Sequence, residues 1–139
     1  MAAPRKKSTG PRRRRATAAL LALSQAALDG VAEGVCVYDA DNRIVLFNRR
    51  YLELFGMSPD VIRPGITYRQ VLEHSASRGN FSPDKFEAMW GAREALLAAR
   101  KPFSTEQVLP SGVVMTLNIR PLPEGGWLTV CDDVTRRAR

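Results

Sequence analysis

The stretch GVCVYDADNRIVLFNRRYLELFG, residues 34–56, decides the fold. Two short β-rich runs, Val35–Tyr38 and Ile44–Phe47, flank the polar residues 39–42, whose short side chains tolerate the backbone conformations of a tight turn. The stretch therefore predicts a β-hairpin. Directly after it, the side chain of Asn48 is placed to cap a helix whose apolar residues recur at helical spacing. We expect this short helix to fold back over one face of the hairpin.

The remainder of the chain predicts further helices and then a run of strands. Thr67 and Gln70 fit a capping box that opens a helix ending near Arg78, and Ser82-Pro83 opens the longest helix, which ends near Arg100. Three β-rich runs follow: Phe103–Leu109, Val113–Arg120 and Trp127–Val134. The order strand, strand, helices, strand, strand, strand predicts an α+β fold with helices on one face of an antiparallel sheet.

The two faces of the predicted sheet differ along its width. In the run 113–120, apolar and polar residues alternate, which indicates one buried and one wet face. Both strands of the first hairpin are instead apolar on both faces, which is typical of strands covered on both sides. We therefore expect the outer face to be apolar only beside the hairpin, at Cys36, Tyr38, Val45 and Phe47. A helix or another molecule would cover that area.

The net charge of +7 belongs to one end of the chain. Seven Lys and Arg lie within residues 1–15, and the other 14 basic residues balance the 14 acidic ones. Residues 1–15 lack large apolar side chains, so we expect a disordered tail. The next segment, 16–30, predicts an amphipathic helix, residues 31–135 one folded domain, and residues 136–139 a short C-terminal tail. The predicted interaction surface combines helix and hairpin: Leu20, Leu21, Leu28, Cys36, Tyr38 and Val45.

Cysteine content and hydropathy indicate the cellular compartment in which the protein works. Two cysteines in a chain of 139 residues argue against a disulfide scaffold and suit a reducing cytoplasm. Cys36 and Cys131 are interpreted as small buried hydrophobic residues. No stretch approaches the ~20 apolar residues of a membrane span, and the apolar part of 16–23 is too short for a secretory signal. We expect a cytoplasmic protein.

The chain from Leu28 to Arg137 resembles a PAS domain of the type found ahead of bacterial histidine kinase and nucleotide-cyclase modules. The resemblance depends on the opening stretch 28–56, the Pro64-Gly65 elbow and the closing triplet Asp133-Val134-Thr135. It implies a PAS-like five-stranded antiparallel sheet. It also implies that Asp133, Val134 and Thr135 are the position where a signal leaves the domain. Only residues 136–139 follow the triplet here, so the usual downstream helix is missing from this sequence.

The sequence lacks the residue patterns of an enzyme or a metal site. His74 is the only histidine, no serine or cysteine has the setting of a nucleophile, and no CxxC pair occurs. Gly125-Gly126 fits a turn and not a phosphate-binding loop. Asp132 and Asp133 are adjacent strand residues that point to opposite faces, so they do not form an acid–base pair. We predict no catalytic activity and no metal.

The resemblance places a ligand pocket between the helices and the sheet. Eight side chains would line it: Phe47, Tyr51, Phe55, Phe86, Met89, Trp90, Met115 and Leu117. Side chains of this size can also fill the space themselves, which is the interpretation we favour, and we predict no cofactor. A small apolar ligand, or haem bound through His74, are the alternatives.

The resulting hypothesis is a stand-alone sensory or protein-interaction module of bacterial-type signal transduction. It would act by forming a homodimer or by docking to a histidine kinase or another signalling protein. A ligand-binding or haem-binding sensor is one alternative. A regulator that binds nucleic acid or an acidic surface through the arginine-rich tail is the other. The tail has no interleaved aromatic residues, so base-specific recognition is not indicated.

Overall fold

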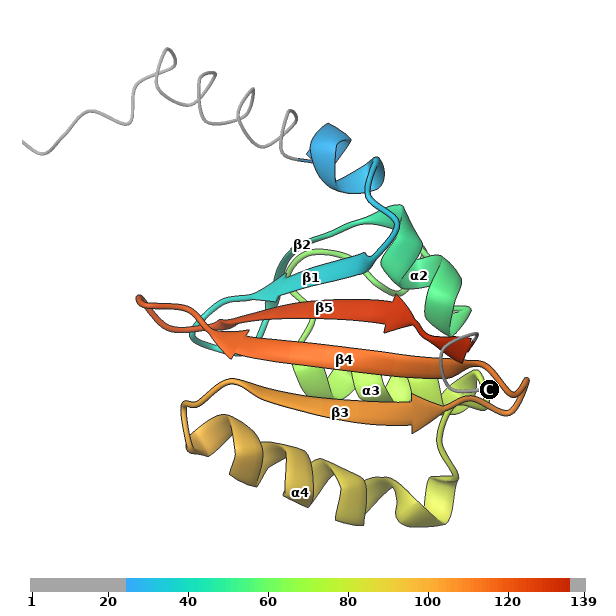
Figure 1. The fold of residues 1–139 in the computed structure, drawn as a ribbon. Helices are drawn as coiled ribbons and strands as arrows, with labels where there is room; N and C mark the ends of the chain where they lie inside the picture. The colour runs from blue at the N-terminus through green and yellow to red at the C-terminus, as the bar shows by residue number, and fades with distance from the viewer. Residues whose placement is uncertain (1–24, 136–139) are drawn as a thin grey trace, which may run out of the picture.

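The structure is a computed structural model that describes residues 25–135. A five-stranded antiparallel sheet has the strand order β2-β1-β5-β4-β3, so the last strand lies in the middle (Figure 1). The elements, in chain order, are β1 (Gly34–Tyr38), β2 (Ile44–Phe47), α2 (Arg49–Phe55), α3 (Tyr68–Ser77), the 3-10 helix η1 (Pro83–Lys85), α4 (Phe86–Ala98), β3 (Phe103–Val108), β4 (Val114–Pro121) and β5 (Trp127–Asp133). The predicted α+β class and element order are confirmed.

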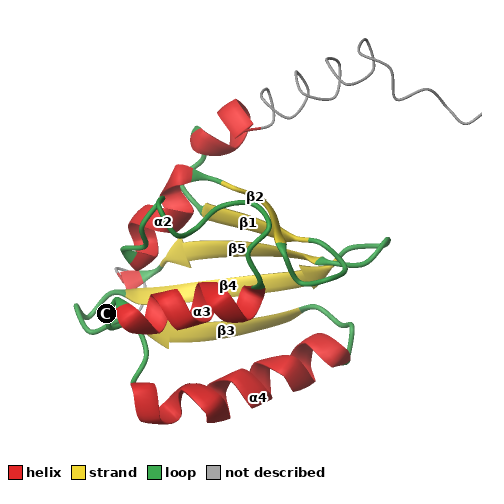
Figure 2. Cartoon of the chain, turned by 180° about the vertical axis from the view of Figure 1, so that it is seen from behind, coloured by secondary structure: helices red, strands yellow, loops and turns green. Residues whose placement is uncertain are grey.

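The helices lie on one side of the sheet, as predicted. Figure 2 shows α3 lying across the sheet and α4 running alongside β3. The predicted capping box opens α3, where Thr67 Oγ1 accepts from the Gln70 N–H at 3.1 Å and Gln70 Oε1 accepts from the Thr67 N–H at 2.8 Å. The predicted longest helix begins with the turn η1 before it becomes α4.

The turn of the first hairpin lies at the polar residues 39–42, as predicted. The Asp39 carboxylate accepts from the N–H groups of Asp41 and Arg43 at 2.9 and 3.0 Å. Asn42 adopts a left-handed conformation with φ of 58°. These contacts replace ladder hydrogen bonds that a tight reversal cannot make, and they fix the register of β1 on β2.

The predicted outward orientation of Cys36 and Tyr38 is wrong. They lie opposite Thr129 and Trp127 on β5 and face the helices, with 0% and 1% of their surface exposed. Because both faces of β1 are apolar, the alternation of apolar and polar residues could not show which face is buried. The neighbouring strand β5 fixes the choice, because its own inner residues belong to the core.

The outer positions of β1 are instead Val35 and Val37. On β2, Val45 is 44% exposed, as expected of an outward residue, whereas Phe47 packs against the core. The predicted wet outer face of β4 is present, since Asn118 is exposed. The inner face of β4 is the buried one, with Met115, Leu117 and Ile119 at 0%, 7% and 1% exposure.

Candidate functional site

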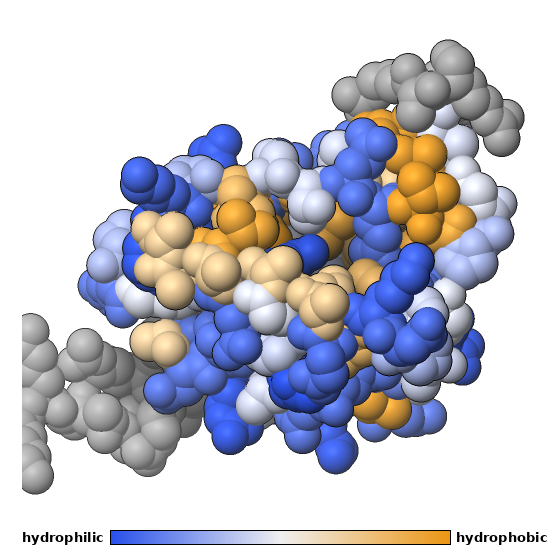
Figure 3. Space-filling view, turned by 90° about the horizontal axis from the view of Figure 1, so that it is seen from below, coloured by the Kyte–Doolittle hydropathy of each residue, from blue (hydrophilic) through white to orange (hydrophobic). Residues whose placement is uncertain are grey.

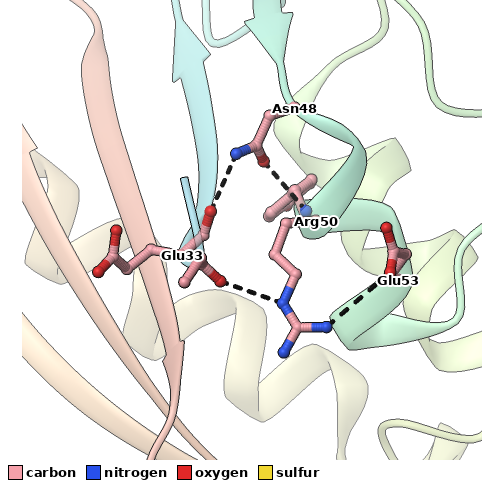
Figure 4. A network of polar contacts seen from close by, with 6 residues as sticks. Glu33, Asn48, Arg50 and Glu53 are labelled. Atoms are coloured by element: carbon pink, nitrogen blue, oxygen red, sulfur yellow. Dashed lines mark hydrogen bonds and ion pairs between the residues drawn. The ribbon is translucent and has the colours of Figure 1, made fainter. Parts of the chain in front are cut away.

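The side chain of Asn48 joins the N-terminal residues of the domain to the hairpin and to α2. It is fully buried at the end of β2, and its Oδ1 accepts from the N–H groups of Val35 at 2.9 Å and Tyr51 at 3.1 Å. Its Nδ2 donates to the carbonyl of Glu33 at 2.9 Å (Figure 4) and to the carbonyl of Leu28 at 2.8 Å. The predicted cap of α2 is confirmed, and the same amide also holds residues 28–33 in place.

Two further contacts strengthen this junction. Arg50 Nε donates to the carbonyl of Ala32 at 3.1 Å, and its guanidinium lies 3.9 Å from the Glu53 carboxylate. Gly34 lies so close to α2 that an added Cβ would be 2.9 Å from the Tyr51 Cα. The first strand and α2 are therefore in backbone contact, with no space for a side chain at Gly34.

An open groove of about 760 Å³ lies beside this junction. Residues 25–29, β2, α2 and the loop 57–64 contribute to its lining, and we call it the β2 groove. Its apolar walls are Val45, Leu46, Phe47, Leu52 and Met57, and the charged side chains at it are Asp29, Arg49, Glu53 and Arg78. Apolar walls with a polar rim are typical of a surface that binds another chain.

Side-chain contacts place the N-terminal residues at the end of the β2 groove. Gln25 Nε2 donates to the carbonyl of Phe47 at 2.7 Å, and the Asp29 carboxylate accepts from the Arg49 N–H at 2.8 Å. Residues 25–29 are helical. The chain therefore enters the domain along the rim of the groove.

The predicted interaction surface is only partly present. Val45 lines the β2 groove, and Leu28 is half-buried at the Asn48 junction. Cys36 and Tyr38 face the core and are not accessible. Leu20 and Leu21 lie outside the described residues, as does most of the predicted helix 16–30.

The α4 side of the molecule also carries exposed apolar residues. Seen from the α4 side in Figure 3, much of the surface is hydrophilic, a band of weakly hydrophobic residues crosses it, and strongly hydrophobic patches lie beside the band. Alanines account for several exposed positions of α4, and Leu96 is its one large hydrophobic residue that is highly exposed, at 42%. The exposed apolar side chains of α4 itself are thus mostly small.

A small void lies between the helices and the sheet, where the resemblance placed a pocket. Its volume is about 20 Å³, enough for about one water-sized group and far below the ~300–1,000 Å³ of a typical ligand pocket. Tyr51, Phe55 and Leu117 line it as expected. The other predicted residues are elsewhere: Phe47 lines the β2 groove, Phe86 and Met115 are buried in the core, and Met89 and Trp90 pack against it.

Several polar residues around this void were not predicted. Tyr38, Tyr68, Ser75, Arg93 and Gln107 contribute to its lining. Burial raises the pKa of the Tyr38 and Tyr68 hydroxyls, so both stay protonated at neutral pH. A signal for Arg93 was present in the sequence, because it lies seven residues after Phe86 and four before Leu97, on the buried stripe of α4.

The two cysteines are buried and free, in agreement with their interpretation as core residues. Burial raises the pKa of Cys36 to about 12 and raises that of Cys131 as well. Since the thiolate is the reactive form, neither thiol is activated as a nucleophile.

His74 does not line the void, and its ring already has a partner. Its Nε2 accepts from the backbone N–H of Ser58 at 3.0 Å, which requires the neutral ring. Burial, with a smaller contribution from the charge of Arg78, lowers the pKa of His74. The small void and the position of His74 do not fit haem.

This geometry predicts a pH dependence of stability. Because the pKa of His74 is lower in the folded than in the unfolded chain, its contribution is complete above about pH 6.5 and is lost as pH falls through the lower folded pKa. We expect urea unfolding of the wild type to show this loss. The variant His74→Gln keeps an acceptor for Ser58 but does not titrate, so it should lack that part of the slope. Equal slopes in the two proteins would contradict the assignment.

The predicted signal-exit triplet forms a compact turn at the end of β5. The Asp133 carboxylate accepts from the N–H and the hydroxyl of Thr135, and Thr135 Oγ1 accepts from the Val114 N–H at 3.0 Å. The Val134 N–H donates to the Val114 carbonyl at 2.9 Å. The triplet thus ties the end of β5 to the start of β4. Its role in signal exit stays a prediction.

Within residues 25–135, no group of three or more His, Cys, Asp or Glu side chains is arranged to hold a metal ion. Over the same part of the chain, no helix has the length and apolar character needed to cross a membrane.

Comparisons with known proteins identify the fold. A family model described as PAS fold matches residues 28–139. The PAS domain of Bordetella pertussis BvgS is similar at 23% identity and a TM-score of 0.59, over 86% of this chain and 90% of that chain. A domain of a sensory box sensor histidine kinase/response regulator from Geobacter sulfurreducens is similar at 18% identity and a TM-score of 0.53, over 91% of this chain and 100% of that one. No curated protein matches the chain.

Proposed function

Because the chain belongs to the PAS fold family, we propose that it is a sensory and protein-interaction module of a signal-transduction system that dimerises through the β2 groove. The observation that carries the proposal is the groove itself, an open apolar hollow at the place where the chain enters the domain. It lies on β2 and α2, which the Asn48 amide joins to residues 28–33.

The proposed occupant is the N-terminal segment of a second copy of the chain. Residues 16–24, reading ATAALLALS, carry three leucines and no charge, and they directly precede Gln25 at the rim of the groove. Because the apolar segment is joined to the rim of the apolar groove, two copies related by a two-fold axis can exchange their segments. The segment of one copy then lies in the groove of the other. Each copy then gives one segment and receives one, which is the self-complementary contact of a symmetric dimer.

Signalling through such a dimer requires only a shift between two arrangements. Occupancy of the groove favours one position of residues 25–33 relative to β2 and α2, because Gln25, Asp29 and Asn48 link these parts by hydrogen bonds. A partner or ligand that prefers the other position changes the population of the dimer. The proposal needs no bond to be made or broken.

The test compares two exposed valines at opposite edges of the sheet. Val45 is 44% exposed on β2 in the groove, and Val108 is 64% exposed on β3. Since both side chains are exposed, Val45→Glu and Val108→Glu should fold like the wild type. By sedimentation equilibrium, we expect Val45→Glu to raise the dimer dissociation constant at least about tenfold, a cost of about 1.4 kcal/mol, and Val108→Glu to leave it unchanged.

A variant in the proposed occupant provides a second readout. Leu21→Glu should weaken the dimer as Val45→Glu does, while both variants keep the unfolding transition of the monomer. A wild type that stays monomeric at all accessible concentrations would overturn the proposal, as would equal effects of Val45→Glu and Val108→Glu.

A further inference from the structure

The histidine of the chain supports one part of the β2 groove. His74 lies on α3, and its Nε2 accepts from the backbone N–H of Ser58 at 3.0 Å. Ser58 stands between Met57 and Pro59, and both of these residues line the groove. The ring therefore holds the lining in place without lining the groove itself.

A second side chain at the end of α3 holds the same part of the groove. Arg78 directly follows α3, and its Nε donates to the carbonyl of Gly56 at 2.8 Å. Gly56 and Arg78 both line the groove. His74 and Arg78 are four residues apart, so they project from neighbouring positions of the chain onto one segment. Residues 56–59, which we call the 56–59 segment, are thus fixed to the end of α3 by two hydrogen bonds.

The residues around this segment limit how far it can move. Met57 and Ile62 belong to the core, with 6% and 1% of their surface exposed. The Ser58 carbonyl accepts from the N–H groups of Val61 and Ile62 at 3.1 and 2.9 Å. Loss of the His74 contact would therefore shift the turn between Met57 and Ile62, which carries Pro59, without unfolding the domain.

The contact between His74 and Ser58 exists only while the ring is neutral. An imidazolium has an N–H on both nitrogens and no acceptor, so protonation would set a donor against the Ser58 N–H. It would also add a positive charge near Arg78, whose field already disfavours the charged ring, as does burial. Protonation would thus remove one hydrogen bond to the 56–59 segment and create repulsion at the other.

No carboxylate in the surrounding elements offsets this repulsion. Acidic residues lie on α2, in the loop 57–64 and on α3, at Glu53, Asp60 and Glu73. Glu53 is paired with Arg50, Glu73 is paired with Arg69, and within residues 25–135 no carboxylate forms an ion pair or hydrogen bond with the His74 ring.

We propose that protonation of His74 releases the 56–59 segment from α3 and thereby weakens the dimer. The inference rests on the proposed function, because it assigns the neutral ring to the form with an occupied β2 groove. Linkage requires the reverse effect as well, so dimer formation should disfavour protonation of the ring. Each dimer contains two copies of His74, so its Kd should rise by up to about a hundredfold per pH unit once the monomer begins to protonate.

The first experiment measures the dimer by sedimentation equilibrium between about pH 7.5 and about pH 5, a range that spans the ordinary titration of histidine. We expect the Kd of the wild type to rise at least about tenfold over this range. His74→Gln keeps an acceptor for Ser58 and does not titrate, so its Kd should stay nearly constant. His74→Leu removes the acceptor and should weaken the dimer already at the upper pH. Every carboxylate is retained in His74→Gln, so a pH response that persists there belongs to other groups.

The second experiment follows the titration of the ring itself by NMR. Because the chain has a single histidine, its ring protons can be assigned without ambiguity. We expect the titration midpoint of the wild type to fall as the protein concentration is raised through the Kd. Val45→Glu, which weakens the dimer, should show one midpoint at all of these concentrations.

The outcomes separate this inference from the proposed function. A wild type that dimerises with the same pH dependence as His74→Gln, or with a His74 midpoint that does not change with concentration, would overturn the inference and leave the dimer standing. A wild type that is monomeric throughout the pH range would overturn both.

Discussion

Replacing Asn48 with alanine is expected to lower the free energy of unfolding by about 4 kcal/mol, a large part of the ~5–15 kcal/mol that stabilises a typical domain. The amide is fully buried and makes hydrogen bonds to backbone groups of Val35, Tyr51, Leu28 and Glu33. Alanine removes all four hydrogen bonds, at about 1 kcal/mol apiece. The Tyr51 N–H and the Leu28 carbonyl each keep a backbone hydrogen bond, to the Asn48 carbonyl and from the Val31 N–H.

The measurement is urea unfolding followed by tryptophan fluorescence. Asn118→Ala on β4 is the matched control, because Asn118 is exposed and its side chain contacts only Ser104 among the described hydrogen bonds. We expect that control to change stability by less than about 0.5 kcal/mol. A loss in Asn48→Ala no larger than in Asn118→Ala would show that the Asn48 amide does not hold the junction.

Replacing Gly126 with alanine is expected to cost more than about 4 kcal/mol, because two separate demands on this position coincide. The backbone has φ of +83°, which side chains rarely adopt. An added Cβ would also lie 2.1 Å from the carbonyl oxygen of Tyr38 and 2.9 Å from the carbonyl carbon of Asp39. These neighbours are backbone atoms, so the strands must move apart to relieve the overlap.

Gly112 allows the cost of the positive φ to be measured apart from the cost of the steric overlap. Its φ is +89°, but an added Cβ there would meet nothing within 4 Å. Gly112→Ala should therefore cost about 1–2 kcal/mol for the backbone conformation alone. Chemical unfolding of both variants gives the cost of the overlap as their difference. If the two variants lose the same stability, the close approach of Gly126 to the first hairpin is not a constraint.

Local features of the fold could be predicted from sequence, because local chemistry determines them. The turn at Asp39, the cap at Asn48 and the capping box of Thr67 and Gln70 each depend on residues within a few positions of one another. The element order followed from the same signals. The family resemblance implied the five strands.

The face that β1 presents to the core could not be predicted from sequence. Val35 and Cys36 are both apolar, so hydrophobic alternation carried no information about which one points inward. The pairing of β1 with β5, almost a hundred residues later in the chain, made that choice. Cys36 and Tyr38 were placed on the outer face for this reason, whereas Val45 on the edge strand is exposed as predicted.

The two sites differ in how far sequence could predict them. The β2 groove depends on the loop 57–64 meeting β2 and α2, a tertiary arrangement without a local signal. The cluster at the void was partly predictable, because a charged Arg93 interrupts the apolar stripe of α4. The positions of Tyr38 and Tyr68 at the void could not be predicted, because tyrosine is an ordinary core residue. Only the packing shows whether its hydroxyl has a hydrogen-bond partner.

The central position of β5 has a consequence for how the chain folds as the ribosome makes it. Both β1 and β4 need β5 as a neighbour, yet β5 is the last of the five strands to be synthesised. Until Trp127–Asp133 has emerged from the exit tunnel, the hairpin and the β3–β4 pair are two separate ribbons, each with an open edge. A nascent chain that stalls before this strand would therefore expose two strand edges with unpaired backbone groups, both able to pair with another chain. It would depend on chaperones until translation resumes.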